Sequence, residues 1–457
     1  MSKVLKDPVH GEIELHPLCV KIVDTLEFQR LRFIKQLGCC YFVYPGAAHN
    51  RFEHCIGVCH LAGKLAQAIR DRQPDKINDR QLLCVKIAGL CHDLGHGPFS
   101  HMFEHFVNSF KGKNWKHEEA SRKLVVRIYG HLKKEFKELG GLEQDDIDFI
   151  KDLIDPPEGL YQRAKDGNVE QKKDFFLYEI VSNATYGVDV DKWDYFARDS
   201  LHLGVKTSFD HDRLITSARA CTDDDGVTHV AYREKVLDHV YEMFHIRYTL
   251  HRKAYQHKVN KAIELMISDA MGKANFVVGV DGYGKEITLS EAVDDLDAFR
   301  KLTDQFVLDK ISEFSKEARE LVDRIYKRKL YRFVGEKRIE LQELNDEETV
   351  TQQEKTIQTE EQLRDELVGE KEGIKKHIKV QIAYFDYGAK DKNPVDKAYF
   401  YTKNEPDIAK HPDKLEDVQS DCLMMKPKYI RVRIARVFCT EEAYVDKVKA
   451  LVDAWNP

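Results

Sequence analysis

The chain has 457 residues, of which 42% are hydrophobic and 33% are charged, and its formal net charge is −6. This composition allows a sizeable buried core under a well-solvated surface, in two or three domains or in one large domain with a smaller lobe. The negative balance excludes the global basic field of a general nucleic-acid binder, although local basic clusters can still bind a small polyanion.

The cysteines and the N-terminus indicate the compartment. Ten cysteines occur without any Cys-x-x-Cys pair, mostly in apolar contexts, which favours reduced, buried thiols over a disulfide framework. The N-terminal sequence MSKVLKDPVHGEIEL lacks the apolar region of a signal peptide, and no run approaches 18 apolar residues. We therefore expect an intracellular protein, nuclear or cytoplasmic, with no membrane segment.

Helical patterns dominate the first 335 residues. Asn50 and Glu53 form a predicted capping box that opens a helix through about Arg70. Asn78 and Gln81 repeat the pattern before a second helix, which the glycines and the proline of residues 95–98 end. Over residues 236–271 the apolar side chains return every three or four positions, which predicts one long amphipathic helix.

The pattern changes after residue 336. Residues 337–375 are rich in Glu, Gln, Thr and Lys and poor in aromatics, so we predict a charged linker there. Alternating apolar residues at 378–384 and 430–434 predict half-buried strands, and 440–455 returns to a helical pattern. The predicted fold is mainly α, with a helical core over 1–336 and a smaller C-terminal α+β lobe over 376–457.

The segment CHDLGHGPFSH, residues 91–101, carries the strongest chemical signal. His92 and Asp93 can offer a nitrogen and a hard oxygen to one cation, although such a doublet alone also suits a structural role. A zinc-protease motif is excluded, because Asp93 stands where that motif needs a Glu and because Gly95 and Gly97 interrupt the required helix. The further histidines around Asp93 favour a functional site.

A second polar pattern lies in GVDVDKWDYFARDSLHLG, residues 187–204. Asp191, Tyr195 and Asp199 are spaced by four, so they line one stripe of a predicted helix. Burying two carboxylates without partners is strongly unfavourable, so a functional stripe competes with a solvated acidic face. His54 lies near the start of the first predicted helix, where a buried core histidine is the ordinary alternative.

These residues together match a family. His54, His92-Asp93 and Asp191 form the H…HD…D pattern of the HD superfamily. NRFEHCIGV, AGLCHDLGHGPFSHMFE, GVDVDKWDYFARD and MFHIRYTLHRKAYQHKV extend the match, and the chain resembles the sterile-alpha-motif/HD-domain deoxynucleoside triphosphate triphosphohydrolases of animals over nearly its whole length. The resemblance begins at KVLKDPVHGEIELHP, so we expect the sterile-alpha-motif domain to be absent.

The resemblance implies a metal centre and a catalytic cluster. His54, His92, Asp93 and Asp191 would bind iron, manganese, zinc or magnesium, among which the sequence does not choose. His96, His101 and His117 would surround the α-phosphate, with His101 as the general acid that protonates the leaving 5′-oxygen. Glu104 stands where the family has an Asp, which changes the expected carboxylate–histidine network.

The resemblance also implies the substrate contacts. Arg51, Lys192 and Arg247 would bind phosphates, and Gln36 and Asp199 would bind the sugar 3′-hydroxyl. Arg247, His251 and Tyr255 are again spaced by four, as one stripe. Tyr255 and Leu37 would crowd C2′ and exclude a ribose, and the implied substrate site is completed by Tyr195 and His251.

Activation by nucleotides and assembly into a homotetramer, through dimers, are further implications. The expected site for GTP or dGTP comprises Lys3, Val4, Asp24, Gln29 and Arg32. The expected second site, for a deoxynucleotide, comprises Val43, Tyr44, Arg213, Arg233, Lys235, Lys258, Arg328, Arg332 and Lys392. Lys6 replaces a family Asn, and Asp238-His239 replaces a Gly-Asn pair, which puts the selectivity of the second site in question.

The leading hypothesis is an enzyme that cuts a deoxynucleoside triphosphate into deoxynucleoside and inorganic triphosphate. The alternatives are another HD phosphodiesterase or pyrophosphohydrolase, and a nucleotide-sensing protein that binds single-stranded nucleic acid, if only weakly. Gly279-x-x-x-x-Gly284-Lys285 imitates a P-loop, but Glu286 replaces the Ser or Thr that would bind magnesium, and Asp281-Gly282 predicts a hairpin turn instead.

Overall fold

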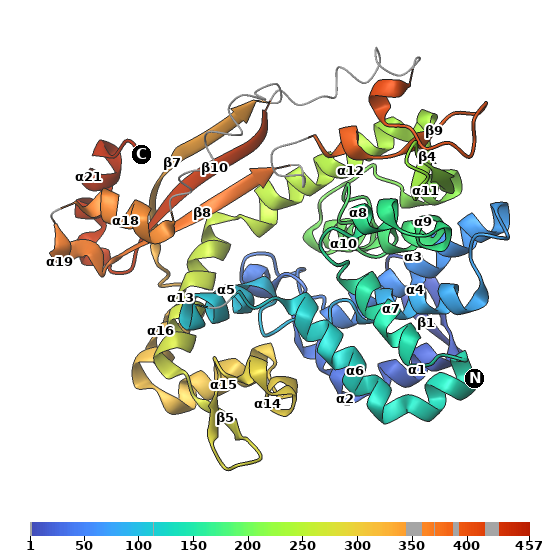
Figure 1. The fold of residues 1–457 in the computed structure, drawn as a ribbon. Coiled ribbons are helices and arrows are strands. Elements are labelled where there is room, and N and C mark those ends of the chain that lie inside the picture. The colour runs from blue at the N-terminus through green and yellow to red at the C-terminus, as the bar shows by residue number, and fades with distance from the viewer. Residues whose placement is uncertain (1, 113, 344–358, 370, 387–392, 416–428) are drawn as a thin grey trace. The chain divides into compact units, whose positions relative to one another are not determined.

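The computed structural model describes residues 2–112, 114–343, 359–369, 371–386, 393–415 and 429–457. The chain forms two compact units. Unit 1 comprises Met1–Ile246, Asn275–Lys310 and Val395–Met425, and unit 2 comprises Arg247–Ala274, Ile311–Pro394 and Lys426–Pro457. Helices dominate (Figure 1), so the predicted mainly α fold is confirmed.

Unit 1 is a helical body with short antiparallel hairpins. Its helices are α1 (Pro17–Val23), α2 (Leu26–Gln29), α3 (Arg51–Arg72), α4 (Asp79–Cys91), α5 (His101–Lys111), α6 (His117–Glu135), α7 (Gln144–Ile154), α8 (Leu160–Asp166), α9 (Val169–Asp174), α10 (Val190–Leu203), α11 (His211–Ser217) and α14 (Leu296–Arg300). Its strands are β1 (Lys3–Asp7), β2 (Gly11–Leu15), β3 (Arg219–Thr222), β4 (Thr228–Arg233), β5 (Val277–Val280), β6 (Glu286–Thr288) and β9 (Phe400–Tyr401).

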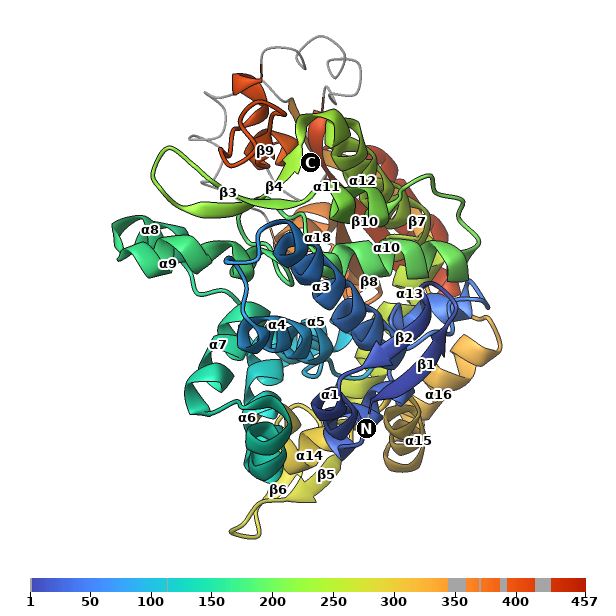
Figure 2. The ribbon, with the colours of Figure 1, turned by 90° about the vertical axis from the view of Figure 1, so that its right-hand side faces the viewer.

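The two predicted capping boxes open α3 and α4. The Asn50 backbone N–H donates to Glu53 at 2.8 Å, and the Asn78 N–H donates to Gln81 at 3.1 Å. Helix α3 is buried on almost every face, and it packs against both α4 and α10 (Figure 2). The H…HD…D residues lie on α3 and α10 and directly after α4, so the packing of these three helices positions the candidate site.

The N-terminal hairpin β1–β2 is antiparallel, with Lys3 opposite Leu15 and Asp7 opposite Gly11. Ile13 and Leu15 are buried while Glu12 and Glu14 are exposed, as expected for a strand with one face on the core. Gly11 follows the turn with a φ of +75°, which glycine adopts without strain.

A buried ion pair fixes β4 in unit 1. The His229 ring lies between two carboxylates, with Nδ1 at 2.8 Å from Glu179 and Nε2 at 3.2 Å from Asp223. Burial alone would lower the pKa of His229, but the two carboxylates outweigh it and raise the pKa to about 9. The ring therefore stays protonated at neutral pH.

Unit 2 contains an α+β region that covers part of the predicted C-terminal lobe, whereas Val395–Met425, also within the predicted range 376–457, belongs to unit 1. The sheet of unit 2 has the antiparallel order β7-β10-β8, formed by β7 (Arg332–Glu343), β8 (Ile378–Asp386) and β10 (Tyr429–Cys439). The helices are α13 (Lys258–Ala274), α16 (Lys316–Tyr326), α18 (Glu360–Val368), α19 (Glu372–Lys375) and α21 (Val445–Ala454). Helix α21 packs on β7 and α18 on β8 around one apolar core, which includes Leu363, Val437 and Val452.

The segment predicted as a charged linker is structured where it is described. Residues 337–343 continue β7, and residues 360–368 form α18, whose Leu363 is fully buried. Its overall polarity hid the few apolar residues that α18 turns to the core. Residues 344–358 lie outside the described residues, and the division into three domains stays a prediction.

The predicted single helix over 236–271 is wrong. The chain forms α12 (Leu237–Leu250), a π-helical turn (His251–Tyr255) and then α13. In the π turn the Gln256 N–H donates to the His251 carbonyl at 2.8 Å, five residues back, and α13 starts afresh at Lys258. Apolar spacing survives such a break because each flanking helix keeps its own buried face. Like α12, α15 (Asp304–Phe314) crosses a boundary between the units.

The P-loop-like segment, residues 279–285, forms a hairpin, as predicted. Strands β5 and β6 pair antiparallel, and the Asp281 carboxylate accepts the N–H groups of Tyr283 and Lys285, both at 2.9 Å. The nine described cysteines are free and buried, while Cys422 lies outside the described residues. Among the helices that the structure describes, none has the length and apolar composition required to cross a bilayer.

Candidate active site

The four predicted metal ligands converge on one point in unit 1. His54 comes from α3, His92 and Asp93 follow α4, and Asp191 lies in the first turn of α10. The Nε2 atoms of His54 and His92 are 3.2 Å apart, and Asp191 Oδ1 lies 3.1 Å from the first and 3.4 Å from the second. Asp93 Oδ2 is 3.4 Å from His54 Nε2. Two imidazoles and two carboxylates thus face one another.

The second nitrogen of each histidine shows that the set fits a metal. His54 Nδ1 donates to Asp194 Oδ2 at 2.7 Å, and His92 Nδ1 donates to the Gly89 carbonyl at 2.9 Å. Because these partners can only accept, both rings are left with Nε2 directed at the shared point. Such support for the outer nitrogen is usual for metal-binding histidines, and mixed imidazole and carboxylate donors suit a divalent metal.

The electrostatics agree with that fit. Burial lowers the pKa of His54, but hydrogen bonds to Asp191 and Asp194 outweigh it and raise the pKa to about 10. Burial alone would raise the pKa of Asp93, whereas the Arg51 cation holds it well below its usual range. The carboxylates are therefore ionised, and protons on the imidazoles supply positive charge that a divalent cation would replace.

The turn after α4 is held by side chains that sequence reasoning missed. Ser121 Oγ donates to the His92 carbonyl at 2.6 Å and accepts the Gly95 N–H at 2.8 Å. The buried Arg30 guanidinium donates to the His96 carbonyl at 2.6 Å. A Cβ on Gly95 would come within 3.0 Å of neighbouring backbone, so only glycine allows this approach.

The same turn ends in two strained residues. Phe99 and Ser100 have φ values of 60° and 58°, which non-glycine residues rarely adopt. Asp304 accepts the Phe99 N–H at 2.7 Å, and Ser100 Oγ donates to the Lys35 carbonyl at 2.7 Å. These bonds hold the strained backbone, which leads directly into α5 and His101.

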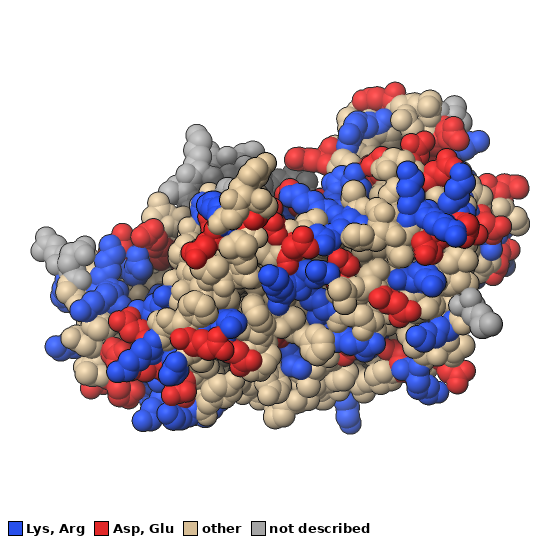
Figure 3. Space-filling view, turned by 90° about the horizontal axis from the view of Figure 1, so that it is seen from below, with Lys and Arg blue, Asp and Glu red and all other residues tan. Residues whose placement is uncertain are grey.

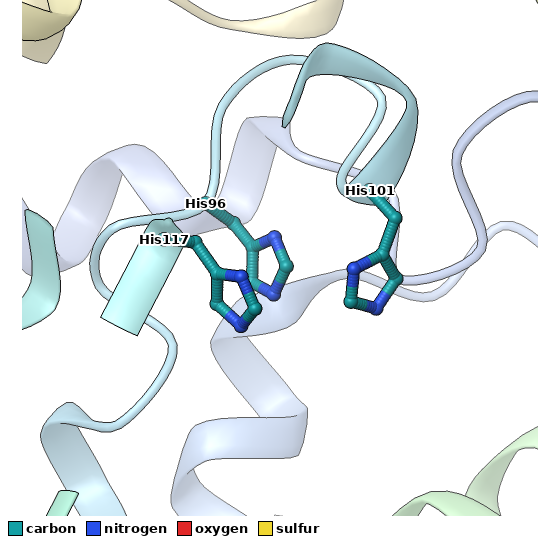
Figure 4. A group of neighbouring side chains, drawn as sticks. All are labelled: His96, His101 and His117. Carbon is teal, nitrogen blue, oxygen red and sulfur yellow. The ribbon is translucent and has the colours of Figure 1, made fainter. Parts of the chain in front are cut away.

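Three predicted catalytic histidines form a second cluster beside the first (Figure 4). The rings of His96 and His117 stack with centroids 3.8 Å apart, and the His101 ring stands edge-on to both, at 4.9 and 5.4 Å. His117 Nδ1 donates to Glu104 at 2.8 Å, so the longer Glu side chain reaches the histidine as a carboxylate partner. His96 Nε2 lies 3.2 Å from Asp93 Oδ1, which links the two clusters.

The three histidines of this cluster differ in their pKa values. Burial and the nearby Arg51 cation lower the pKa of His96 well below its usual range. As a whole residue His101 is exposed to solvent, but desolvation of its ring and the same Arg51 cation lower its pKa to about 3. Burial also lowers the pKa of His117, but Glu104 outweighs it, and the pKa is raised. In the ligand-free chain His117 therefore holds the proton, while the predicted general acid His101 is neutral at pH 7.

Two of the predicted phosphate ligands lie in unit 1. The buried Arg51 donates to Asp93, to Ser100 Oγ at 3.1 Å and to the Gln36 carbonyl at 3.1 Å, so it is fixed beside the ligand cluster. Lys192 Nζ lies 2.7 Å from Asp189 at the start of α10. Both cations are positioned by carboxylates before any substrate is present.

The two predicted contacts to the sugar, Gln36 and Asp199, have different surroundings. Gln36 is buried, and its Oε1 has no hydrogen-bond partner among the described residues, so it is available to a ligand. Asp199 instead accepts from His49 Nε2 at 2.6 Å, with both side chains buried. His49 was not foreseen. The remaining unit 1 contacts are the half-buried Leu37, after Gln36, and Tyr195, whose ring centroid is 6.5 Å from that of His54.

The other predicted substrate contacts belong to unit 2. Arg247 Nη1 donates to the Asp386 carboxylate at 2.9 Å. The rings of His251 and Tyr255 meet within the π turn, with centroids 4.9 Å apart. The π turn breaks the predicted four-residue stripe after Arg247. The part of all three residues in substrate binding stays a prediction.

The predicted guanine-nucleotide residues lie on β1 and around α2. Lys3 and Val4 are exposed on β1, and Asp24 is exposed at the end of α1. Arg32 donates to Gln29 at 2.8 Å, and its guanidinium lies 3.5 Å from the centroid of the Phe52 ring. The stacked guanidinium of Arg32 can offer positive charge to a ligand, and the exposed carboxylate of Asp24 can offer an acceptor.

The second predicted activator site is divided between the units. In unit 2, Lys258, Arg328 and Arg332 line one cavity of about 820 Å³, together with Arg324 and Lys329, which sequence reasoning missed. Lys392 lies outside the described residues. The members in unit 1 are Val43 and Tyr44 after the 3₁₀ turn Gly38–Phe42, Arg213 on α11, Arg233 at the end of β4 and Lys235 before α12.

Comparison with known proteins identifies the family. Residues 51–199 match the HD domain family. Deoxynucleoside triphosphate triphosphohydrolase SAMHD1 of Gallus gallus is 42% identical, over 97% of this chain and 72% of the relative. The protein of the same name from Homo sapiens is 41% identical, over 96% and 70%, and the Dictyostelium discoideum homologue is 37% identical, over 88% and 71%. The chain therefore belongs to the SAMHD1 family of HD-domain deoxynucleoside triphosphate triphosphohydrolases.

Proposed function

We propose that this protein is a metal-dependent hydrolase that cuts a deoxynucleoside triphosphate into deoxynucleoside and inorganic triphosphate. The observation that carries the proposal is the convergence of His54, His92, Asp93 and Asp191 at one point. The names of the relatives supply the substrate class, and the HD domain supplies the expectation of a divalent metal. Iron, manganese, zinc and magnesium all accept such donors, so the donor set leaves the metal open.

The chain's own residues account for charge and proton transfer. A divalent metal, when bound, supplies a Lewis acid and lowers the pKa of a coordinated water. Arg51 and Lys192 offset part of the roughly four negative charges of a triphosphate. A phosphate beside His101 raises the pKa of that ring, because an anion favours the protonated imidazole. His101 then donates to the leaving 5′-oxygen, while Glu104 keeps His117 charged beside it.

Regulation by nucleotides is the second part of the proposal. GTP or dGTP binds at Lys3, Val4, Asp24, Gln29 and Arg32, a deoxynucleoside triphosphate binds at the second site, and a homotetramer built from dimers is the active form. The exposed β1 residues and the five cations of the unit 2 cavity support this assignment. Ligands drive assembly only in proportion to their preference for the tetramer.

Sedimentation tests the regulatory part. Analytical ultracentrifugation of the wild type with GTP plus a deoxynucleoside triphosphate should show a tetramer, and Asp24→Ala should require more GTP to reach it. Lys6 and Asp238-His239 differ from the family, so the second site is the one whose selectivity we expect to differ. A fully active monomer that ignores nucleotides contradicts this part and leaves the catalytic part standing.

Weak binding of single-stranded nucleic acid is a lesser candidate. Figure 3 shows Lys and Arg interspersed with Asp and Glu on the face that it draws, which favours local polyanion sites over an extended basic groove. Binding that weakens steeply with salt and requires Lys258 or Arg332 would assign it to the nucleotide cavity.

Product analysis tests the catalytic proposal. Each of the four deoxynucleoside triphosphates is incubated with metal-loaded protein, with and without GTP, and the products are separated by anion-exchange chromatography. We expect deoxynucleoside and inorganic triphosphate from the wild type and none from His54→Ala. Pyrophosphate with a monophosphate, or orthophosphate with a diphosphate, would assign a different phosphohydrolase reaction.

A further inference from the structure

The turn of the β1–β2 hairpin carries a buried histidine that no catalytic role uses. His10 lies between the two strands, and 2% of its side chain is exposed. Its Nε2 donates to Asp194 Oδ1 at 2.6 Å, across 184 positions of sequence. Figure 2 shows this hairpin in unit 1, as the N-terminal blue pair of strands.

Asp194 is the residue that supports a proposed metal ligand. Its Oδ2 accepts from His54 Nδ1 at 2.7 Å, and the Arg198 guanidinium donates to both carboxylate oxygens at 2.9 Å. Asp194 and Arg198 are fully buried. One carboxylate therefore joins His10 on the hairpin to His54 in the cluster.

A second contact anchors the same turn. Asp7, the last residue of β1, accepts Arg198 Nη1 at 2.9 Å through Oδ2. Its Oδ1 accepts the backbone N–H groups of Val9 at 2.9 Å and His10 at 2.8 Å, which fixes the shape of the turn. The turn therefore reaches the Asp194–Arg198 pair twice, once from Asp7 and once from His10.

We propose that the β1–β2 hairpin is a positioning element of the metal centre, in which His10 holds Asp194 so that His54 keeps Nδ1 protonated and Nε2 directed at the metal. This inference rests on the proposed metal role of His54. Outer partners of metal-binding histidines fix the tautomer and the ring orientation, and here the outer partner has a partner of its own. His10 is a positioning residue and does not touch substrate.

The arrangement has a regulatory consequence. Lys3 and Val4, which are both exposed on β1, belong to the same hairpin as Asp7 and His10. Because coupling between two binding sites is reciprocal, a ligand that stabilises the hairpin strengthens metal binding, and the metal stabilises the hairpin to the same extent. A nucleotide on β1 would thereby act on the metal centre through packed, buried contacts.

Two substitutions of His10 separate positioning from packing. His10→Phe keeps an aromatic ring and loses the donor, whereas His10→Gln loses the ring and keeps an N–H near the position of Nε2. His60→Phe is the matched control, because the His60 ring packs beside the His10 ring, with the two ring centroids 5.4 Å apart. A packing role predicts that Phe is the milder change at residue 10, and a positioning role predicts the opposite.

The measurement is the Mn²⁺ affinity of metal-stripped protein, followed by electron paramagnetic resonance of free Mn²⁺. Direct outer partners of metal ligands change metal affinity by about 10- to 100-fold, and His10 acts one step further out, through Asp194. We therefore expect His10→Phe to bind Mn²⁺ more weakly by up to about 10-fold, and His10→Gln and His60→Phe to stay near the wild type. Wild-type affinity in a folded His10→Phe overturns the inference. If His54→Ala also binds normally, the metal assignment itself fails; if His54→Ala loses the metal, only the role of His10 fails.

Hydrogen exchange of the wild type tests the coupling without any substitution. Mn²⁺ should slow amide exchange in residues 7–15, whereas the β5–β6 hairpin of the same unit serves as the control and should change little. Equal effects of Mn²⁺ on the two hairpins, or none on residues 7–15, overturn the inference even where His10→Phe does not fold.

Discussion

Gly57→Ala places a single methyl group against the support of the metal centre. Gly57 lies in α3, one turn after His54, and a Cβ there would come within 3.0 Å of both Asp194 Oδ1 and Arg198 Nη2. Real Cβ atoms do not approach other atoms so closely. The backbone of Gly57 is helical, so alanine would otherwise be the better residue at this position, by about 1 kcal/mol.

The clash decides the sign of the effect. Asp194 and Arg198 are fully buried, so neither can move into solvent, and the carboxylate must turn away from its partners. Separating a buried ion pair destabilises a protein by about 3–5 kcal/mol, which exceeds the helix-propensity gain and leaves a net loss of about 2–4 kcal/mol. The same rotation removes the acceptor of His54 Nδ1, so metal affinity falls with stability.

Gly130→Ala is the matched control, because Gly130 also lies inside a helix, α6, and a Cβ there would meet no atom within 4 Å. Thermal unfolding of metal-free protein should show a lower midpoint for Gly57→Ala and an unchanged or slightly higher one for Gly130→Ala. Mn²⁺ should raise the midpoint of Gly57→Ala less than that of the wild type. A Gly57→Ala protein as stable and as metal-responsive as Gly130→Ala would refute the reasoning.

Three further outcomes are expected. His92→Ala and Asp93→Ala, each alone, should abolish hydrolysis and remove the metal, while the circular dichroism spectrum stays near that of the wild type. A normal metal content in the variant that carries both substitutions would contradict the assignment of these residues as metal ligands. Tyr255→Ala should bring the dATP-to-ATP rate ratio closer to one, and a wild type that hydrolyses both equally fast would contradict steric exclusion at C2′. Because the pKa of His229 is raised to about 9, its ion pair should contribute fully to the free energy of unfolding below about pH 6.5. That contribution, up to about 3 kcal/mol, should be lost as the pH rises through 9. His229→Gln should make the free energy of unfolding depend less on pH over this range, and an unchanged pH dependence would exclude this ion pair.

The sequence predicted the helices and strands correctly where the pattern involved residues close together in the chain. Capping boxes fixed the starts of α3 and α4 because both partners lie three residues apart. The alternation at 378–384 and 430–434 predicted β8 and β10, and the H…HD…D pattern selected residues that the fold does bring together. Spacing along a helix or strand is read directly from the order of residues.

Contacts made across the fold could not be read in this way. His10 and Asp194 are 184 residues apart, and His49 and Asp199 are 150 apart, so neither pairing leaves a local pattern. His10 stands in the turn DPVHGE, where an exposed polar residue is the ordinary expectation. The π turn at 251–255 also escaped prediction, because it changes the hydrogen-bond register and leaves the apolar spacing on either side intact.

Hydrolysis in ¹⁸O-labelled water tests the central claim most directly. If the site formed by His54, His92, Asp93 and Asp191 directs water to the α-phosphorus, and His101 protonates the leaving 5′-oxygen, the bond between phosphorus and the 5′-oxygen breaks. Mass spectrometry of the products from dATP should then find one ¹⁸O in inorganic triphosphate and none in deoxyadenosine. Label in deoxyadenosine, or products other than deoxynucleoside and triphosphate, would contradict the account.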